Sequence, residues 1–472
     1  MLPSRAISGL ALAVLTASFG TSAANISLPA LVDSFDSRPS EVQWVVVAYL
    51  LGMTAASVTV GALGDRVGRR RALRAGTLLF LVAAVVSATA TTLPVLVLAR
   101  AVQGVAAAIM TALPIALARD LTADGRTGRA MGLLGTTSAV GTALGPAAGG
   151  ILVEWGGWMA PFWAMLPLGA LALMMLVPRD LLVADASDRP RRPFDGIGAT
   201  LLSAGIAAYA LALAAPTPGW PVLPLLGVAA ALLAATVMAE RRAASPVLPL
   251  AELRSGPVVA GVIGNLLVAA VMMTTLVVGP FALHDGLGLP VAVAGLVMTV
   301  GPVTAAISGV VAGRVVDRTS SPALTTCALA LVTVGAVGLA LLPGVWGVPG
   351  YIAALIVLTP GYQLFLAATN TRVLSGAAPV RRGAVAGVLA LARNLGLVTG
   401  ASAMGSLFLA LRGSEAAPSA VLDAMRATFL VAAVLAAVAT AASVVLARSA
   451  GPTAPRPPVT RRERPARSRT RR

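Results

Sequence analysis

The sequence predicts an all-α integral membrane protein, and three observations carry that prediction. Hydrophobic residues make up 57% of the 472 residues and charged residues 11%, and the mean hydropathy is +0.89, far from the values of soluble globular proteins. Apolar stretches of about 18 or more residues recur along the chain, each long enough to cross roughly 30 Å of hydrocarbon as a helix. These stretches are continuous rather than alternating, which excludes a transmembrane β-barrel.

Fourteen stretches meet this description at a spanning length of roughly 20 residues. In order, they cover residues 7–30, 42–63, 75–93, 95–118, 130–152, 160–177, 196–215, 221–239, 257–281, 291–313, 323–342, 350–371, 384–410 and 426–447.

The arginines test this topology, because all 35 basic residues are arginine. With a cytoplasmic N-terminus, only Arg38, Arg412 and Arg426 fall in outer loops, and Arg100 and Arg393 fall inside spans. The other arginines lie on the cytoplasmic side, as the positive-inside rule requires. We therefore expect a multi-pass protein in the plasma membrane of a bacterium, with both termini cytoplasmic.

The spans group into two blocks of six with two extra spans between them. We expect an N-terminal six-helix bundle at 1–178, a cytoplasmic linker at 179–195 and two inserted helices at 196–240, which carry almost no polar side chains and should face lipid. A cytoplasmic interfacial segment at 241–256, a C-terminal six-helix bundle at 257–447 and a disordered Arg-rich cytoplasmic tail at 448–472 complete the chain.

Composition also excludes several functions. The net charge of +17 comes from arginines in membrane loops and a tail without interleaved aromatic residues, so we expect contact with anionic lipid heads and no nucleic acid. One Cys and one His cannot build a metal site, and we expect no cofactor. Cys327, inside an apolar span, is expected to be a packing residue.

The most informative motif joins the second and third spans and combines glycine with charge: Gly61, Gly64, Asp65, Arg66, Gly68, Arg69 and Arg70. Its glycines allow a tight turn and close backbone approach. The pattern Gly-x-Leu-x-Asp-Arg-x-Gly-Arg-Arg-Arg resembles the loop between helices 2 and 3 of the major facilitator superfamily of secondary transporters. A weak copy at 309–318 follows the second span of the C-terminal block.

The resemblance implies that this loop is a gate. Asp65 would meet the positive N-terminus of span 13 near Gly383 and hold the cytoplasmic side closed, and Arg69 would pair with Asp120. A simple topology signal is the alternative interpretation.

Span 4 carries Arg100, Gln103 and Gly104, and span 13 carries Arg393. The pattern Arg-x-x-Gln-Gly resembles the superfamily's span-4 motif, which is associated with proton coupling. A buried intramembrane arginine is a functional candidate by default. A structural role, in which backbone carbonyls of helix 1 and Gln103 satisfy Arg100, stays open.

Span 5 carries a glycine-proline series: Gly132, Gly141, Gly145, Pro146, Gly149 and Gly150. It resembles the signature of drug and metabolite antiporters rather than importers. A helix with such a small-residue face is suited to rocking against a partner helix, and ordinary close packing is the alternative.

Helix 1, around Asn25, and the start of span 6 resemble the fourteen-helix drug:proton antiporter branch. Two departures stand out, because Gly20 replaces the aspartate usual in helix 1 and Met165 replaces an asparagine usual in span 6. All 18 acidic residues lie in loops, helix ends or the tail. A proton would therefore bind near a span end, at Asp33, Glu41 or Glu154, or on the substrate.

The expected substrate cavity lies between the two blocks. Sparse polar or adaptable side chains make candidates for its wall, although packing or a helix–helix hydrogen bond is as good an explanation of each: Asn25, Trp44, Tyr49, Asn265, Met272, Gln363 and Asn370. Arg100 and Arg393 lack matching buried acids, which favours neutral, zwitterionic or anionic amphipathic substrates over lipophilic cations.

Together these features predict a monomeric secondary transporter that exports a small amphipathic compound, a drug or secondary metabolite, in exchange for protons. An importer or uniporter with the same fold is the alternative. An enzyme is excluded because no nucleophile, metal or acid-base constellation is present.

Overall fold

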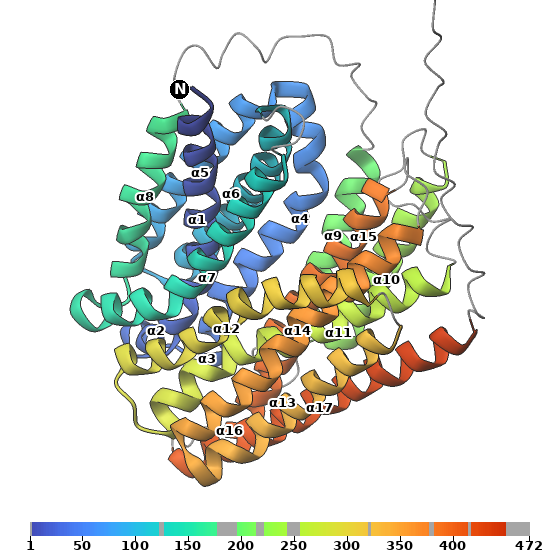
Figure 1. Ribbon diagram of the computed structural model, residues 1–472. Helices are drawn as coiled ribbons and strands as arrows, with labels where there is room; N and C mark the ends of the chain where they lie inside the picture. The colour runs from blue at the N-terminus through green and yellow to red at the C-terminus, as the bar shows by residue number, and fades with distance from the viewer. Residues whose placement is uncertain are drawn as a thin grey trace, which may run out of the picture.

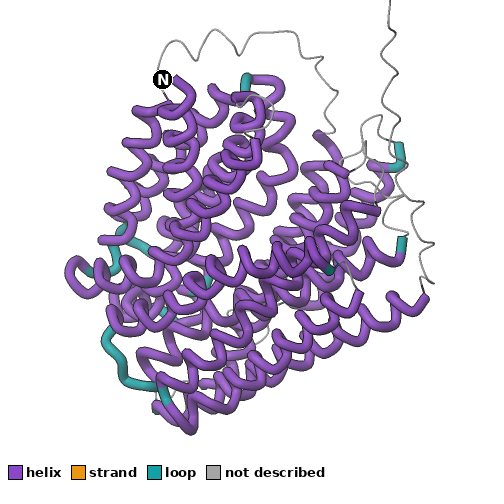
Figure 2. The backbone as a smooth tube through the Cα atoms, viewed as in Figure 1, coloured by secondary structure: helices purple, strands orange, loops and turns teal. Residues whose placement is uncertain are grey.

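The computed structural model of the protein describes residues 2–121, 127–176, 196–213, 221–242, 255–319, 322–376, 382–413 and 417–449, and all regular structure in these ranges is helical (Figure 2). The predicted linker 179–195 lies outside the described residues, as do most of the segment 241–256 and of the tail 448–472.

The N-terminal half forms one bundle of six long helices. They are α1 (Leu2–Ile26), α4 (Trp44–Val67), α5 (Arg69–Ala88), α6 (Leu93–Leu121), α7 (Thr127–Gly156) and α8 (Ala160–Leu176), with short helices α2 (Leu28–Phe35) and α3 (Pro39–Val42) between α1 and α4.

The C-terminal half forms the second bundle. Its helices are α11 (Gly256–Phe281), α12 (Val291–Arg318), α13 (Pro322–Trp346), α14 (Val348–Gly376), α15 (Arg382–Thr399), α16 (Gly405–Arg412) and α17 (Pro418–Ser449). Two single π-helical turns interrupt the pattern, η4 (Ala282–Gly286) after α11 and η5 (Gly400–Met404) between α15 and α16.

Twelve helices of the described residues are long and apolar enough to cross a membrane. Helix α4, with 24 residues, and α8, with 17, coincide with the predicted spans 42–63 and 160–177 but are not among those twelve. Helix α8 is the shorter of the two, and the structure does not describe some side chains of α4. The count of fourteen therefore goes beyond what this criterion supports.

Several predicted boundaries move for identifiable reasons. The charged loop after the second span shrinks to Gly68, whose φ of 96° suits glycine, so α4 runs to Val67 and α5 begins at Arg69. The first predicted span divides at Ser27, because Pro29 occupies the first turn of α2 and lacks an N–H to continue α1. The span predicted at 384–410 contains the π-turn η5.

The outer surface of the bundles is apolar, as a lipid-facing surface requires. Leu98, Leu223, Met174 and Val434 are each at least 60% exposed, and similar side chains occur on most helices. A soluble protein rarely exposes so large an apolar surface. This surface explains why the helices are apolar on every side rather than amphipathic.

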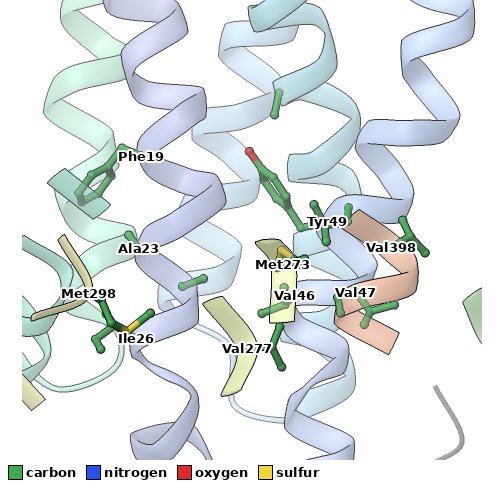
Figure 3. Packing of buried hydrophobic residues seen from close by; sticks show 14 of the residues in the cluster. Phe19, Ala23, Ile26, Val46, Val47, Tyr49, Met273, Val277, Met298 and Val398 are labelled. Carbon is green, nitrogen blue, oxygen red and sulfur yellow. The ribbon is translucent and has the colours of Figure 1, made fainter. Parts of the chain in front are cut away.

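The two bundles meet at one end and diverge toward the end where the N-terminus lies (Figure 1). We call these the closed end and the open end. At the closed end, one buried apolar cluster continues across the bundles, with Ile26 and Val46 from the first and Met273, Val277 and Val398 from the second (Figure 3).

The inserted helices α9 (Gly196–Leu213) and α10 (Val222–Glu240) form a hairpin beside the bundles. Helix α10 is largely exposed, as expected of a lipid-facing helix. Helix α9 differs from that expectation, because it contacts α4 of the first bundle and both α15 and η5 of the second. One inserted helix therefore lies across the boundary between the bundles.

Candidate functional site

A cavity of about 680 Å³ lies between the two bundles. Four helices of each bundle line it, namely α1, α4, α6 and α7 on one side and α11, α12, α14 and α15 on the other. Its volume is in the range of small-molecule binding sites, and its wall is mainly apolar with scattered hydroxyl groups. The predicted location of a substrate site between the halves coincides with this cavity.

Methionines form an adaptable part of the wall. Met53, Met272, Met273 and Met298 come from three helices of the two bundles, and the flexible, polarisable thioether side chain can adjust to ligands of different shape. Met272 is the one member of the predicted set of seven cavity residues that lines this cavity.

The other six predicted cavity residues lie elsewhere, because their side chains have local partners or face away. The Asn265 Nδ2 donates to the Gly261 carbonyl at 2.8 Å, and the Gln363 Nε2 donates to the Ala305 carbonyl at 3.1 Å. Asn370 is exposed, and Trp44 packs against the apolar cluster. Asn25 and Tyr49 are buried, as described below.

The prediction that Arg393 is buried was wrong, because its side chain is exposed. It projects from α15 into the cavity wall, and it is the one charged side chain among the described residues that line the cavity. Within the described residues it makes no hydrogen bond or ion pair with protein, and its neighbour in sequence, Asn394, also lines the cavity.

Arg100 behaves in the opposite way and is completely buried between α4 and α6. Its Nε donates to the Val45 carbonyl at 3.2 Å and its Nη1 to the Gln103 Oε1 at 2.6 Å. The guanidinium lies 4.1 Å from the ring centroid of Tyr49, a cation–π distance. The structural alternative expected Arg100 to bond to backbone carbonyls of helix 1. The carbonyl that accepts from Arg100 belongs instead to Val45 of α4.

Arg100 reaches the cavity only indirectly. The Tyr49 hydroxyl donates to the Ala17 carbonyl at 3.0 Å and accepts a hydrogen bond from the Thr21 Oγ1 at 3.0 Å, and Thr21 lines the cavity. Gly104 lies so close to the backbone of Tyr49 that a Cβ atom would collide with the Tyr49 carbonyl. The span-4 motif therefore packs α6 tightly against α4.

Gly20 occupies the position in helix 1 where an aspartate is usual in the resembling branch, and this position is crowded. A Cβ atom on Gly20 would lie 2.7 Å from the Phe80 Cζ and 3.6 Å from the Met165 Sδ. An aspartate side chain at this position would require Phe80 to move. The Met165 Sδ accepts a hydrogen bond from the Gln103 Nε2 at 3.4 Å.

The glycine-proline series of α7 faces two neighbours. Gly141, Gly145 and Gly149 pack against α1, where added Cβ atoms would crowd Leu15, Ser22 and Ile26 respectively. Pro146 and Gly150 pack against Gly295 of α12, in the second bundle. The side-chain surroundings of Gly132 lie outside the described residues.

The contact between α7 and α12, which we call the α7–α12 seam, closes one side of the cavity. A Cβ atom on Gly150 would lie 2.8 Å from the Val291 carbonyl oxygen, and one on Gly295 would collide with the Pro146 carbonyl. The Thr299 Oγ1 donates to the Ala143 carbonyl at 3.3 Å. Beyond the glycines, the Glu154 Oε2 accepts from the Ala292 N–H at 3.1 Å, in the first turn of α12.

A second contact, which we call the α4–α15 seam, closes the opposite side. The Gln43 Nε2, just before α4, donates to the carbonyls of Ala401 and, at 3.2 Å, Ser402. Both carbonyls belong to the π-turn η5. A π-turn alters the backbone hydrogen-bond pattern and is frequent at functional sites.

Helix α9 adds hydrogen bonds to both sides of the α4–α15 seam. The Tyr209 hydroxyl and the Thr399 hydroxyl lie 2.9 Å apart, and the Ser203 Oγ donates to the Ala55 carbonyl at 3.2 Å. Thr399 belongs to α15 and Ala55 to α4, so α9 binds both bundles.

Four side chains at the closed end are buried with polar atoms that have no hydrogen-bond partner among the described residues. They are both amide atoms of Asn25, the Oγ of Ser27, the Oε1 of Gln43 and the Oγ of Ser402.

The predicted gate motif lies at the open end, around the turn at Gly68. A Cβ atom on Gly64 would lie 2.8 Å from the Leu113 Cδ2, so α4 and α6 approach each other closely at this point. Arg66 is exposed, and Arg69 and Arg70 are half-buried. The side chains of Asp65 and Asp120 lie outside what the structure describes, as do the environments of Gly61 and Gly383, so the predicted latch stays a prediction.

Sequence reasoning missed the hydroxyl groups of the cavity. Ser18 and Ser138 lie 2.9 Å apart across α1 and α7, and Thr21 and Thr142 continue the same two helix faces by three and four residues. Isolated serines and threonines are common in apolar helices because they bond to their own backbone. Helical spacing of hydroxyl residues, as in Ser18–Thr21 and Ser138–Thr142, is the signal that could have revealed them.

Comparison with known proteins agrees with this arrangement. The chain is 27% identical over 390 residues to the riboflavin transporter RibZ of Clostridioides difficile, covering 81% of this chain and 83% of that protein. It is 28% identical over 414 residues to the multidrug efflux pump LfrA of Mycolicibacterium smegmatis, covering 87% and 82%. It is 30% identical over 412 residues to the drug efflux pump JefA of Mycobacterium tuberculosis, covering 84% and 79%.

Solved structures share the fold at low identity. The nucleoside transporter NupG superposes with a TM-score of 0.65 at 13% identity, covering 94% of this chain and 100% of that one. The peptide transporter POT in complex with sulfate gives 0.70 at 15% identity, covering 94% and 95%. The family description Major Facilitator Superfamily matches residues 10–401 and 262–472. The chain is thus a multi-pass membrane protein that belongs to the Major Facilitator Superfamily of transporters.

Proposed function

We propose that the protein exports small amphipathic compounds by alternating access, driven by proton antiport. The single observation that carries the proposal is the cavity between the bundles, with its mixed wall of methionines, hydroxyl groups and one arginine. Relatives named multidrug or drug efflux pumps support export as the direction. Both halves of the cavity wall belong to the same chain, so the proposal takes a monomer as the working unit.

The proposal includes an orientation and a span count. The N-terminus and the Gly68 turn face the cytoplasm, so the open end is cytoplasmic and the closed end faces outward. The proposal also has helices α4 and α8 cross the membrane beside the twelve helices that meet the length and hydropathy criterion. On that count of fourteen, the protein would be a member of the fourteen-helix drug:proton antiporter branch. The gate at Asp65 then acts on the cytoplasmic side, in the outward-facing state.

Proton binding in this proposal occurs outside the cavity, because no acidic side chain of the described residues lines it. Asp33, Glu41 and Glu154 remain the candidates, all of them exposed or half-buried at the closed end. Of the three, Glu154 has a carboxylate that accepts a hydrogen bond across the α7–α12 seam.

Uptake or uniport of a metabolite is a second candidate function. One relative is named a riboflavin transporter, and the same cavity serves either direction of movement.

Accumulation assays in a pump-deficient bacterial host test the proposal. Expression of the protein should lower the accumulation of some amphipathic drugs in a panel, and a protonophore should restore it. Ala305→Trp, which fills the cavity, should abolish this effect, whereas Val303→Trp on the exposed face of the same helix should keep it. Raised accumulation upon expression would favour uptake instead.

A further inference from the structure

Among the described residues, the cavity wall carries a single formal charge, and that charge is positive. Arg393 is the one ionised side chain among the described lining residues, and none of the lining residues is Asp or Glu. The rest of the wall is apolar or carries uncharged hydroxyl, amide and thioether groups. From the described part of the wall, a ligand inside the cavity therefore meets one cation and no fixed anion.

Three arginines within or beside the apolar helices can be compared. Arg100 is fully buried and bonded to Val45 and Gln103, and Arg412 forms an ion pair with Asp285 at 3.0 Å. Arg393 has neither kind of partner within the described residues and remains exposed to the cavity. Its guanidinium is the one left available to a ligand.

Arg100 adds to the positive potential of the cavity from behind its wall. Arg100 lies against Tyr49, and the Tyr49 hydroxyl bonds to the lining residue Thr21. The described partners of Arg100 are a carbonyl, an amide and aromatic rings rather than a carboxylate. Because charges inside a protein are less screened than in water, an uncompensated arginine at this depth disfavours a cation in the cavity.

We infer that the cavity binds amphipathic organic anions, chiefly carboxylates, with Arg393 as the residue that pairs with the anionic group. The inference rests on the proposed function for the identity of the site, and it adds the chemical class of the substrate. A planar guanidinium matches a carboxylate with two parallel hydrogen bonds, and Asn394 beside it offers a further amide donor.

The rest of the cavity wall suits the apolar body of such a ligand. Tyr362 and Met272 line the cavity together with Met53 and Leu50 from the other bundle. Aromatic and thioether side chains contact rings of varied shape, so specificity comes from the charge and tolerance from the apolar wall.

Equilibrium binding separates this inference from the question of export. Purified full-length protein in nanodiscs of zwitterionic lipid is titrated with nalidixic acid, an amphipathic carboxylate, with its ethyl ester, and with the cation ethidium. The acid should bind at least about tenfold more tightly than the ester, as expected for one charge-assisted hydrogen-bonded pair. Ethidium should bind most weakly.

Variants assign the preference to Arg393. Arg393→Gln should remove the advantage of the acid while the ester's Kd stays within about twofold, and Arg393→Lys should retain part of the advantage. Arg318→Gln is the matched control, since it removes the same charge from the exposed end of α12 and should leave the preference intact. Melting temperatures of the variants in the nanodiscs check that each remains folded.

Several results would overturn the inference: no binding of the acid to wild type, tighter binding of ethidium than of the acid, or equal weakening of acid and ester by Arg393→Gln. None of these measurements depends on the direction of transport. A failed efflux assay with intact acid preference would refute export alone.

Discussion

The two seams close the same end of the molecule by different means. At the α7–α12 seam, backbone meets backbone through Gly150, Gly295 and Pro146, and hydrogen bonds are secondary. At the α4–α15 seam, Gln43 reaches carbonyls of η5, and the inserted helix α9 bonds to both sides. The first seam depends on shape and the second on directional polar contacts.

Because of this difference, the two seams should respond differently to substitutions. Close packing of small residues fails abruptly when volume is added, because interiors cannot accept even a few extra atoms without moving. Polar contacts fail more gradually, since each lost hydrogen bond has a limited net effect. Substitutions at the two seams should therefore differ in the size of their effect on transport.

Gly295→Leu should have the largest effect. The side chain would collide with the Pro146 carbonyl and approach Gly150, so the closed end could not form and transport should fall below about a tenth of wild type. Gly313→Leu on the same helix is the control, because no atom lies within 4 Å of an added Cβ there. Wild-type efflux by Gly295→Leu would show that the α7–α12 seam is not needed for closure.

Gln43→Ala should follow. It removes the donor to Ala401 and Ser402 and leaves buried carbonyls of η5 without that partner, which should slow transport by about fivefold to tenfold. Gln363→Ala, which removes a hydrogen bond within one bundle, is the comparison. Transport rates in reconstituted vesicles measure both, and equal effects of the two variants would deny Gln43 a special role at the seam.

Tyr209→Phe should have a smaller effect of about twofold to threefold on transport rate, since it removes one hydroxyl bond to Thr399. Ser203→Ala removes the bond at the other end of α9. If α9 couples the two bundles, the double variant should slow transport no more than the larger single variant does. Fully multiplicative effects would mean that the two bonds act independently.

Glu154→Gln should have the smallest effect at the α7–α12 seam, below about threefold, because the amide still accepts from the Ala292 N–H and only the charge near the start of α12 is lost at an exposed site. Efflux measured against an imposed pH gradient checks this. Complete loss of proton-driven efflux with a stable protein would instead identify Glu154 as the coupling carboxylate.

Hydropathy alone located the helices, because a membrane span must be long and apolar whatever it contacts. Glycine spacing also identified Gly145 and Gly150 as close-packing positions. The direction in which a side chain points was harder to predict. Arg100 and Arg393 both sit in apolar runs, yet one is buried between helices and the other lines the cavity. That difference depends on how each helix is rotated, which is set by contacts between distant segments.

Helix α9 illustrates the same limit. Its sequence is as apolar as that of a lipid-facing helix, and its two relevant hydroxyl groups, on Ser203 and Tyr209, become meaningful only beside Ala55 and Thr399. The turn at Gly68 shows the converse, because the motif was visible but its charges belong to helices rather than to a long loop.

The unpaired polar atoms of Asn25, Ser27, Gln43 and Ser402 affect the balance between two conformations, one with the closed end formed and one with it opened. Each buried polar atom without a partner destabilises a structure by about 1–3 kcal/mol. A conformation that exposes these atoms to water would recover that free energy. The recovered free energy offsets part of the stabilisation that the apolar contact gives to the closed end. These atoms therefore reduce the free energy by which the closed end is favoured. Since reversing a 99:1 population takes about 5.5 kcal/mol of differential binding, a reduction of this kind lowers the differential affinity that a ligand must supply.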